Sequence, residues 1–330
     1  MLAMTLHAAG ESLRAEDVAE PWPRPGEVRL RVKACGVCRT DLHIIDGDLP
    51  LSRSPIIPGH EIVGVVDALG EGVAGVHMGD RLGVPWLGGT CGHCAYCLEQ
   101  AENLCDAPAF TGWTRNGGFA EAVVVDARSA FPIPASYSDE AAAPLMCAGL
   151  IGFRSWRKAC EARPVARLGI YGFGAAGHLL AQLAIHEGQD VYAFVRPGDD
   201  AAKQLALSLG CVWAGGSDQA PPQLLDAAII FAVVGDLVPT ALSAVRKGGT
   251  VVCGGIHMSD IPSFAYERLW GERRLESVAN LTRQDGRDYL PLAAKAGVKP
   301  RVTVYPLDQA NAALSDLRSG RLVGAAVLKP

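Results

Sequence analysis

The sequence has few aromatic residues and no excess of positive charge. Aromatic residues make up 6% of the chain, and 30 basic side chains stand against 35 acidic ones, for a net charge of −5. Proteins that bind nucleic acids usually show a basic excess, so we expect no nucleic-acid partner. Charged residues amount to 20% of the chain, which is ordinary for a globular protein and excludes a disordered one.

Long apolar runs are also missing. The longest weakly charged stretch, residues 168–185, is interrupted by glycines and is more typical of a buried strand, turn and helix than of a membrane span. The segment from Met1 to Arg14 shows no basic region followed by an apolar one, which argues against a secretory signal. We therefore expect a cytoplasmic protein without a membrane partner, in which cysteines stay reduced.

Glycine and cysteine, by contrast, are abundant, with 38 and 10 copies in 330 residues. The length predicts two domains. Short β-type runs separated by Pro and Gly turns fill the first ~145 residues and predict an irregular β-rich domain. Examples of these runs are residues 27–33, 61–68 and 120–125. Ser138 is expected to cap an Ala-rich helix that follows.

From Arg167 onward, apolar strands alternate with helical segments. We expect strands at 168–171, 191–195, 227–234 and 250–253, and helices at 175–187 and 201–209. Continuous apolar strands are typical of a parallel sheet covered on both faces, so this part predicts a doubly wound α/β domain. After about Asn280 the pattern becomes less regular, with strands expected at 301–305 and 324–328 and a helix at 308–318.

Four cysteines are clustered with the spacing C-x2-C-x2-C-x7-C, at Cys91, Cys94, Cys97 and Cys105. Four thiolates from one loop suit a structural Zn²⁺, which has no open position for chemistry. Iron–sulfur runs use a shorter last spacing followed by proline, whereas Asp106 follows here. The alternatives are an iron–sulfur cluster and a loop of free or disulfide-bonded cysteines.

A second set is scattered along the chain, with Cys38, His60 and Cys147 as its members. Together they form the ligand set of a catalytic Zn²⁺, with two thiolates, one imidazole and one open position. Taken singly, Cys147 or His60 is more typical of a packed core residue. Cys35 and Cys38 also form a C-x-x-C pair that a redox site could use.

Polar residues beside these ligands extend the second site. Asp41 is expected either to accept the ring N–H of His60 or to cap a loop. The hydroxyl of Thr40 can take the proton of an alcohol, and His43 can pass it toward solvent, unless His43 is a structural histidine. Glu61 is either a transient metal ligand or a charge near the metal, with a surface ion pair as the alternative.

The segment Gly172-Phe173-Gly174-Ala175-Ala176-Gly177 fits the pattern G-x-G-x-x-G between a strand and a helix. Such glycines allow a tight turn and the approach of a pyrophosphate, so Gly172, Gly174 and Gly177 are expected to bind a dinucleotide. Val195 stands where an acid normally holds the ribose 2′-hydroxyl, and Arg196 follows. This favours NADP slightly and leaves NAD as the alternative.

Several motifs, taken in order along the chain, resemble the zinc-dependent alcohol dehydrogenases of the medium-chain dehydrogenase/reductase superfamily. They are GVCRTDLH at 36–43, PGHE at 58–61, the four-Cys loop, LMCAG at 145–149 and GFGAAG at 172–177. The yeast and bacterial type is the most similar, and a cinnamyl-alcohol-dehydrogenase-like branch is also possible. The departure from the family pattern is Val195-Arg196, where NAD-specific relatives carry Asp.

The resemblance implies a GroES-like β-rich catalytic domain (1–146 and 282–330) interrupted by a Rossmann NAD(P)-binding domain with a doubly wound parallel sheet (147–281). It implies two Zn²⁺ per chain, one of them catalytic with Glu61 as an alternative ligand. It places Arg39 near the cofactor pyrophosphate and Trp86 and Trp113 around the substrate. A homodimer or homotetramer, formed partly through the edges of the Rossmann domain, is expected.

The predicted function is the interconversion of alcohols with aldehydes or ketones by hydride transfer to and from NAD(P). The alternative enzyme is a zinc-independent quinone or enone reductase of the same superfamily, which should lack both cysteine-containing sets. The non-catalytic alternative is a zinc-stabilised scaffold or nucleotide sensor. The small-molecule substrate itself and the physiological direction stay open.

Overall fold

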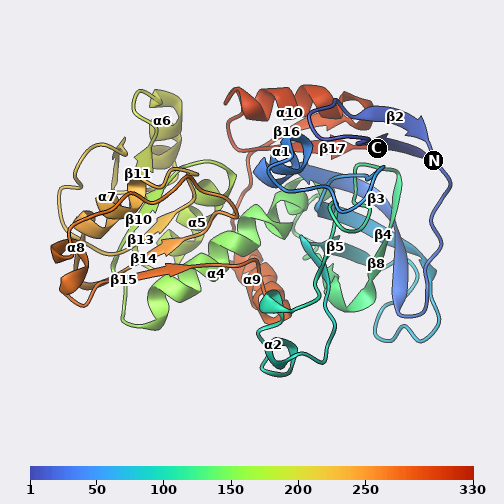
Figure 1. Ribbon diagram of the computed structural model, residues 1–330, viewed down its shortest axis with the longest axis horizontal. Helices are drawn as coiled ribbons and strands as arrows, with labels where there is room; N and C mark the ends of the chain where they lie inside the picture. Colours follow the sequence, from blue (N-terminus) through green and yellow to red (C-terminus); the bar gives the residue numbers. More distant parts are fainter. The chain divides into compact units, whose positions relative to one another are not determined.

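The computed structural model describes residues 1–330, which form two units (Figure 1). The first comprises Met1–Ala148, Leu281–Ala294 and Pro300–Pro330, and the second comprises Gly149–Asn280 and Lys295–Lys299. The predicted α/β class is confirmed. The domain boundaries after residues 146 and 281 stay a prediction.

The second unit is built on a six-stranded, wholly parallel sheet. Its strands lie in the order β12-β11-β10-β13-β14-β15, so the chain starts in the middle, builds outward to one edge and then returns to build the other half. This is the strand order of a Rossmann fold, with a switch point between β10 and β13. The bounds are β10 (Arg167–Tyr171), β11 (Asp190–Val195), β12 (Trp213–Gly216), β13 (Leu225–Ile230), β14 (Val245–Cys253) and β15 (Arg274–Ser277).

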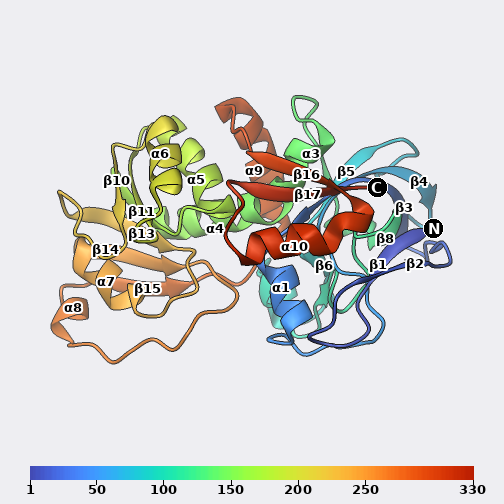
Figure 2. The same cartoon turned by 90° about the horizontal axis from the view of Figure 1, so that it is seen from above.

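Apolar side chains on both faces hold this sheet between helices (Figure 2). On one face, residues such as Ile170 and Ala193 pack in a cluster with α4 (Ala148–Glu161), α5 (Ala175–His186) and α6 (Asp200–Ser208). On the other face, their strand neighbours Tyr171 and Phe194 pack in a cluster with α7 (Leu237–Ala244). Because side chains alternate along a strand, strands covered on both faces are apolar throughout, as the sequence indicated.

The first unit contains a seven-stranded sheet in the order β16-β17-β3-β4-β5-β9, with β8 also paired to β3. Strand β17 lies antiparallel to β3, so the C-terminal segment completes a sheet begun near the N-terminus. The bounds are β3 (Glu27–Val37), β4 (Glu61–Leu69), β5 (Arg81–Val84), β8 (Ala122–Asp126), β9 (Phe131–Pro132), β16 (Val302–Pro306) and β17 (Ala325–Lys329).

Shorter elements surround this sheet. Two small sheets pair β1 (Leu2–Thr5) with β2 (Arg14–Asp17) and β6 (Leu87–Gly89) with β7 (Ala109–Phe110). The helices of the unit are α1 (Arg39–Asp46), α2 (Ala95–Leu98), α3 (Asp139–Ala142), α9 (Arg283–Ala296, ending beyond the unit) and α10 (Ala310–Arg318). No helix in either unit combines the length and apolarity that crossing a membrane requires.

The sequence-based elements differ from the structure at a few places. The strand expected at 227–234 ends at Ile230. Ser138 does cap a helix by accepting a hydrogen bond from the N–H of Ala141, but that helix, α3, has only four residues. It gives way to a 3₁₀ turn that contains Pro144, a residue that cannot donate a backbone hydrogen bond. Helix α7 was not predicted, because its short apolar sequence lacks a polar stripe.

The buried α7 face gives a stability prediction. Leu242 on α7 is fully buried, whereas Leu207 on α6 is 49% exposed. We expect Leu242→Ala to lower the free energy of unfolding by about 2–5 kcal/mol, through lost apolar contact and a residual cavity. The matched variant Leu207→Ala should stay within about 0.5 kcal/mol of the parent. Denaturant titration measures both, and equal stabilities for the two variants would contradict this account of the core.

Candidate functional site

The pairing of β3 with β4 brings Cys38 and His60 together. In this antiparallel ladder Gly36 lies opposite Glu61, so the residues just after β3 meet those just before β4. The Cys38 Sγ lies 3.1 Å from His60 Nε2. A side chain at position 36 would overlap the carboxylate of Glu61, so only glycine allows this close register.

Four potential ligands converge at this point. Cys147, which follows the 3₁₀ turn after α3, joins Cys38, His60 and Glu61, and their donor atoms all lie within 4.8 Å of one another. Both oxygens of Glu61 are buried without a hydrogen-bond partner, and burial raises the pKa of this carboxyl well above its usual range. Buried carboxylates are normally paired or bound to a metal. Two thiols, an imidazole and a carboxyl without a partner therefore fit a metal ion.

Asp41 organises this cluster from behind. Its side chain is fully buried and accepts hydrogen bonds from the backbone N–H of Cys38 at 2.9 Å, from that of Gly59 at 3.2 Å and from His60 Nδ1 at 3.2 Å. It thus both caps α1 and orients the imidazole, combining the two interpretations of this residue. When the hydrogen of a neutral His60 lies on Nδ1, Nε2 carries the lone pair that faces Cys38 and can bind a metal.

The ionisable groups of this cluster shift one another's pKa values. The hydrogen bond to Cys147, with the nearby His60, keeps the pKa of Cys38 well below that of an ordinary thiol. Burial alone would lower the pKa of His60, but the charges of Cys38 and Asp41 more than offset it and raise that pKa well above its usual range. Metal binding to such a site would release protons.

The four cysteines predicted to form a structural metal site also lie close together. The sulfur atoms of Cys91, Cys94, Cys97 and Cys105 lie within 4.8 Å of one another, on the loop that carries α2. Backbone N–H groups of His93 and Cys94 point at Cys91 and lower its pKa to about 6, so this thiol ionises readily. Four sulfur donors and no other group in the cluster match a closed tetrahedral metal site.

Thr40 and His43 lie one turn apart on α1, which begins directly after Cys38. Both side chains are buried, and the backbone N–H of Thr40 points at Cys38 Sγ at 3.3 Å. His43 Nδ1 lies 2.8 Å from a carboxylate oxygen of Asp48. Asp48 was missed in the sequence, because only the left-handed Gly47 after α1 turns the chain back toward His43. Arg39, the first residue of α1, is exposed.

Trp86 and Trp113 belong to one aromatic stack. Their rings lie 5.8 Å apart and nearly parallel, and Phe110 stacks on both. The edge of this stack reaches the metal cluster, since Trp86 lies 5.1 Å from the His60 ring in an edge-on contact. Phe110 was not predicted from sequence, because the pairing of β6 with β7 brings it to Trp86.

The glycine-rich segment forms the turn between β10 and α5. Gly172 has a positive φ of 94°, and a Cβ there would lie 2.8 Å from the backbone nitrogen of Ala232. Gly174 caps α5, and a Cβ on Gly177 would lie 2.5 Å from the carbonyl oxygen of Gly172. This tight turn opens a helix N-terminus at the switch point of the sheet, which is where dinucleotide pyrophosphates bind.

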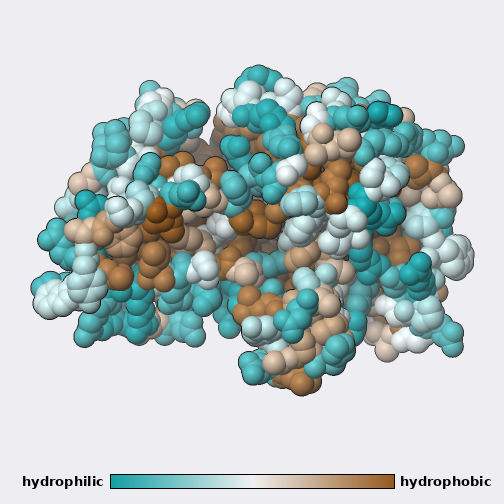
Figure 3. Space-filling model, viewed as in Figure 1, coloured by the Kyte–Doolittle hydropathy of each residue, from teal (hydrophilic) through white to brown (hydrophobic).

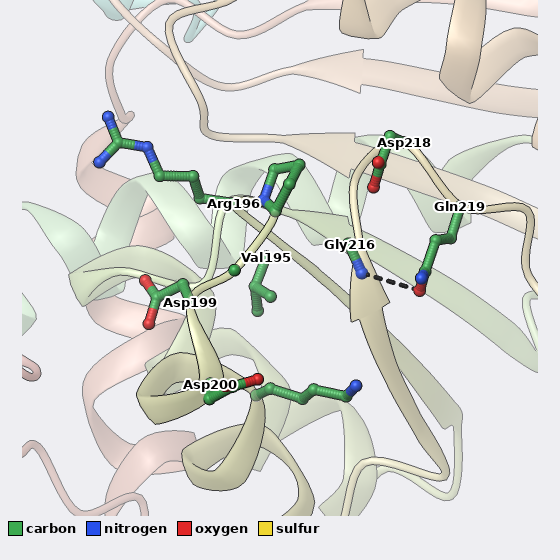
Figure 4. A pocket seen from close by; sticks show the side chains of 10 residues that line it. Val195, Arg196, Asp199, Asp200, Gly216, Asp218 and Gln219 are labelled. Carbon is green, nitrogen blue, oxygen red and sulfur yellow. Dashed lines mark hydrogen bonds between the residues drawn. The ribbon is translucent and has the colours of Figure 1, made fainter.

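A pocket of about 210 Å³ lies at the ends of β11 and β12 (Figure 4). Val195, Arg196 and Asp199 come from the first strand end, and Asp218 and Gln219 from the second. The side chain of Arg196 makes no hydrogen bond or ion pair, and its guanidinium points away from Asp218 and Gln219. Asp199 accepts the N–H of Ala202 and so caps α6.

Comparisons with known proteins agree with this geometry. The model of the alcohol dehydrogenase GroES-like domain matches residues 24–135. A probable alcohol dehydrogenase of Mycobacterium tuberculosis is 46% identical over 314 residues, which cover 93% of this chain and 90% of that protein.

Solved structures give the same result for the fold. A thermostable alcohol dehydrogenase from Pyrobaculum aerophilum, with cobalt and zinc bound, superposes with a TM-score of 0.91 at 28% identity, covering 100% of this chain and 99% of that one. Acetophenone reductase from Geotrichum candidum, in complex with NAD, gives 0.89 at 26% identity, covering 100% and 97%. These findings confirm the family resemblance and do not favour a quinone or enone reductase. The chain belongs to the alcohol dehydrogenase family and is an oxidoreductase that interconverts alcohols and aldehydes.

Proposed function

We propose that this oxidoreductase depends on zinc and on a nicotinamide cofactor, with two Zn²⁺ per chain. The observation that carries the proposal is the convergence of two different donor sets, each within 4.8 Å. One set consists of four thiols, and the other combines two thiols, an imidazole and a buried carboxyl. The metal-bound relative from Pyrobaculum supports zinc in this family.

Cys38, His60 and Cys147 would hold the catalytic ion, with Glu61 in reserve as a fourth ligand. Zinc in such a site supplies a Lewis acid that polarises the substrate oxygen and favours the alkoxide. Asp41 keeps the His60 ring in the ligating tautomer by accepting its Nδ1 hydrogen. Cys91, Cys94, Cys97 and Cys105 would hold the second ion, which stabilises the loop around α2.

Thr40 and His43 would move the proton of the alcohol. The Thr40 hydroxyl accepts the proton as the substrate is oxidised and hands it on, and the His43 imidazole passes it toward water. Their spacing of three residues puts both on one face of α1. The stacked rings of Trp86 and Trp113 form the apolar wall that orients a small alcohol or aldehyde.

The nicotinamide cofactor supplies the hydride acceptor in alcohol oxidation. Gly172, Gly174 and Gly177 would receive its pyrophosphate at the start of α5, and Arg39 would add a positive charge to that group. NADP is favoured slightly, because Arg196 and Lys203 line the pocket after β11 without an ion-pair partner. NAD stays the alternative, because Asp200 and Asp218 line the same pocket, and the Geotrichum relative binds NAD.

A homodimer or homotetramer is the expected assembly. Strand β15 is an edge strand of the parallel sheet, and edges with unpaired backbone groups invite pairing. Exposed apolar side chains occur on the same segment of chain, at Ile261, Tyr266, Trp270 and Leu275. Figure 3 shows apolar surface gathered over the region of α7 and β15. Exposed apolar patches of this kind mark interfaces between subunits.

The two metal assignments predict different defects. Cys94→Ser should leave about one zinc per chain and lower the thermal midpoint, because structural zinc binding contributes folding free energy. Cys147→Ser should abolish turnover with little loss of stability. Cys160→Ser, which changes a thiol outside both clusters, serves as the control. Elemental analysis, melting curves and turnover test these expectations. If Cys94→Ser melts like the parent and Cys147→Ser stays active, both assignments are wrong.

The proton path predicts graded losses of turnover. Thr40→Ala should reduce kcat by about 10²–10⁴-fold, because it removes the first proton acceptor. His43→Gln should cost less, below about 10²-fold, since water can take its place. Zinc content, measured in parallel, should equal that of the parent in both variants. Parental turnover in Thr40→Ala would exclude Thr40 from the mechanism.

Cofactor preference is predicted to depend on Arg196. A charge-assisted contact to a 2′-phosphate is worth about 1.5–3 kcal/mol, or about tenfold to a hundredfold in affinity. Arg196→Ala should therefore reduce kcat/KM for NADP by that factor and leave the value for NAD nearly unchanged. A parent enzyme that prefers NAD, or an unchanged ratio in the variant, would remove the NADP preference while the alcohol dehydrogenase assignment stands.

A further inference from the structure

Arg283, the first residue of α9, contacts the four-Cys loop at both of its ends. Its Nη2–H donates to the hydroxyl of Thr90 at 2.7 Å, directly before Cys91. Its backbone N–H donates to a carboxylate oxygen of Glu102 at 2.7 Å, three residues before Cys105. A single residue of a distant helix therefore joins the start of this loop to its end.

Two further contacts fix the Arg283 side chain. Its Nε–H donates to the carbonyl oxygen of Arg128 at 3.1 Å, and its Nη1 lies 3.7 Å from the carboxylate of Glu102. The side chain of Glu102 is only 8% exposed and that of Arg283 is 23% exposed. Solvent ions screen such a pair less than one on the open surface. We call the contacts of Arg283 with Thr90, Glu102 and Arg128 the clasp.

The loop buries few side chains between these two ends. Helix α2, in its middle, has no buried residue, and Leu98 at the end of that helix is 72% exposed. Burial resumes only at Glu102, Asn103 and Cys105. A segment with so little apolar packing gains little stability from the core. Its conformation therefore depends on a bound metal and on the contacts at its ends.

The clasp changes what a metal ion has to do in this loop. An ion that ties four cysteines together must offset the conformational entropy of ordering the loop around it. When contacts outside the ligand set already hold both ends, part of that entropy is lost when the protein folds and not when the ion binds. Such preorganisation strengthens binding and slows release.

We propose that the clasp preorganises the four-Cys loop and controls how long the loop keeps its metal. Arg283 is a positioning residue in this account, and it lies 181 residues after Glu102 in the sequence. The inference rests on the proposed structural zinc and adds a contact from α9 to that site.

The test measures the transfer of zinc from the zinc-loaded protein to a chromogenic chelator. Cys94→Ser identifies the phase of release that belongs to the loop, because that phase should be missing in this variant. Arg283→Ala should accelerate the loop phase by about tenfold, at the low end of the effects of residues that orient metal ligands. The phase of the other zinc should keep its parental rate.

Arg287 supplies the matched control. It lies one turn further along α9, it is exposed, and its side chain makes no hydrogen bond or ion pair. Arg287→Ala removes the same charge from the same helix without touching the clasp. Both zinc ions should leave this variant at parental rates.

Thr90→Val probes the same contact with little change in shape. It removes the hydroxyl that accepts from Arg283, so the loop phase should accelerate, by less than in Arg283→Ala. In the double variant the acceleration should be smaller than the product of the two single effects, because both changes remove the same hydrogen bond. If Arg283 only stabilised the fold, the two zinc phases would change together and the two effects would multiply.

Several results would overturn the inference. A loop phase at the parental rate in Arg283→Ala or in Thr90→Val would show that the clasp does not retain the metal, while the two-zinc proposal stands. Equal acceleration of both phases would assign Arg283 to general stability. A parent protein without a loop phase would remove the structural zinc and the clasp with it. If Arg283→Ala does not fold, the rate of the loop phase in Thr90→Val is the deciding measurement.

Discussion

The register between β3 and β4 is the constraint on which the candidate site depends. It sets Gly36 opposite Glu61 and so fixes where the chain leaves one strand and enters the next. A shift by one residue would turn every side chain of one strand to the opposite face, and the donor atoms of Cys38 and His60 would no longer meet. The missing side chain at Gly36 is what lets a carboxylate occupy this space. The backbone pairing of β3 with β4 thus determines which donor atoms lie together in this unit.

Burying so many ionisable groups in one place would be unfavourable without compensation. His60, Asp41 and Glu61 are at most 1% exposed. Asp41 is compensated by three N–H donors, but Glu61 has none. A cation among these groups removes the remaining cost, since opposite charges offset desolvation when the geometry is good. The same ion would then serve stability and catalysis, and it would account for a buried carboxyl that has no hydrogen-bond partner.

The sequence predicted those parts of the structure that depend on local spacing. The four-Cys loop, the glycine turn after β10 and the apolar strands of the parallel sheet are all encoded by short segments, because a loop or a strand can be judged from neighbours in the chain. The parts it missed depend on pairing between distant segments or on a backbone turn whose path the residue types alone do not give. Phe110 reaches Trp86 only through the β6–β7 pair, and the carboxylate beside His43 needs the left-handed turn at Gly47.

Cofactor binding can be predicted from the sequence more readily than the preference for NAD or NADP, because the fold constrains the residues of the first and not those of the second. The turn at Gly172 and Gly177 is required by backbone packing, since a Cβ at either position would press on a neighbouring backbone atom. Position 196, in the loop after β11, has no such requirement. The side chain of Arg196 is exposed and makes no hydrogen bond, so the fold does not constrain which side chain stands there. Because no packing or hydrogen bond depends on this side chain, its charge can change without destabilising the sheet. Selectivity between a ribose hydroxyl and a 2′-phosphate can therefore change at this position while the rest of the dinucleotide site stays the same.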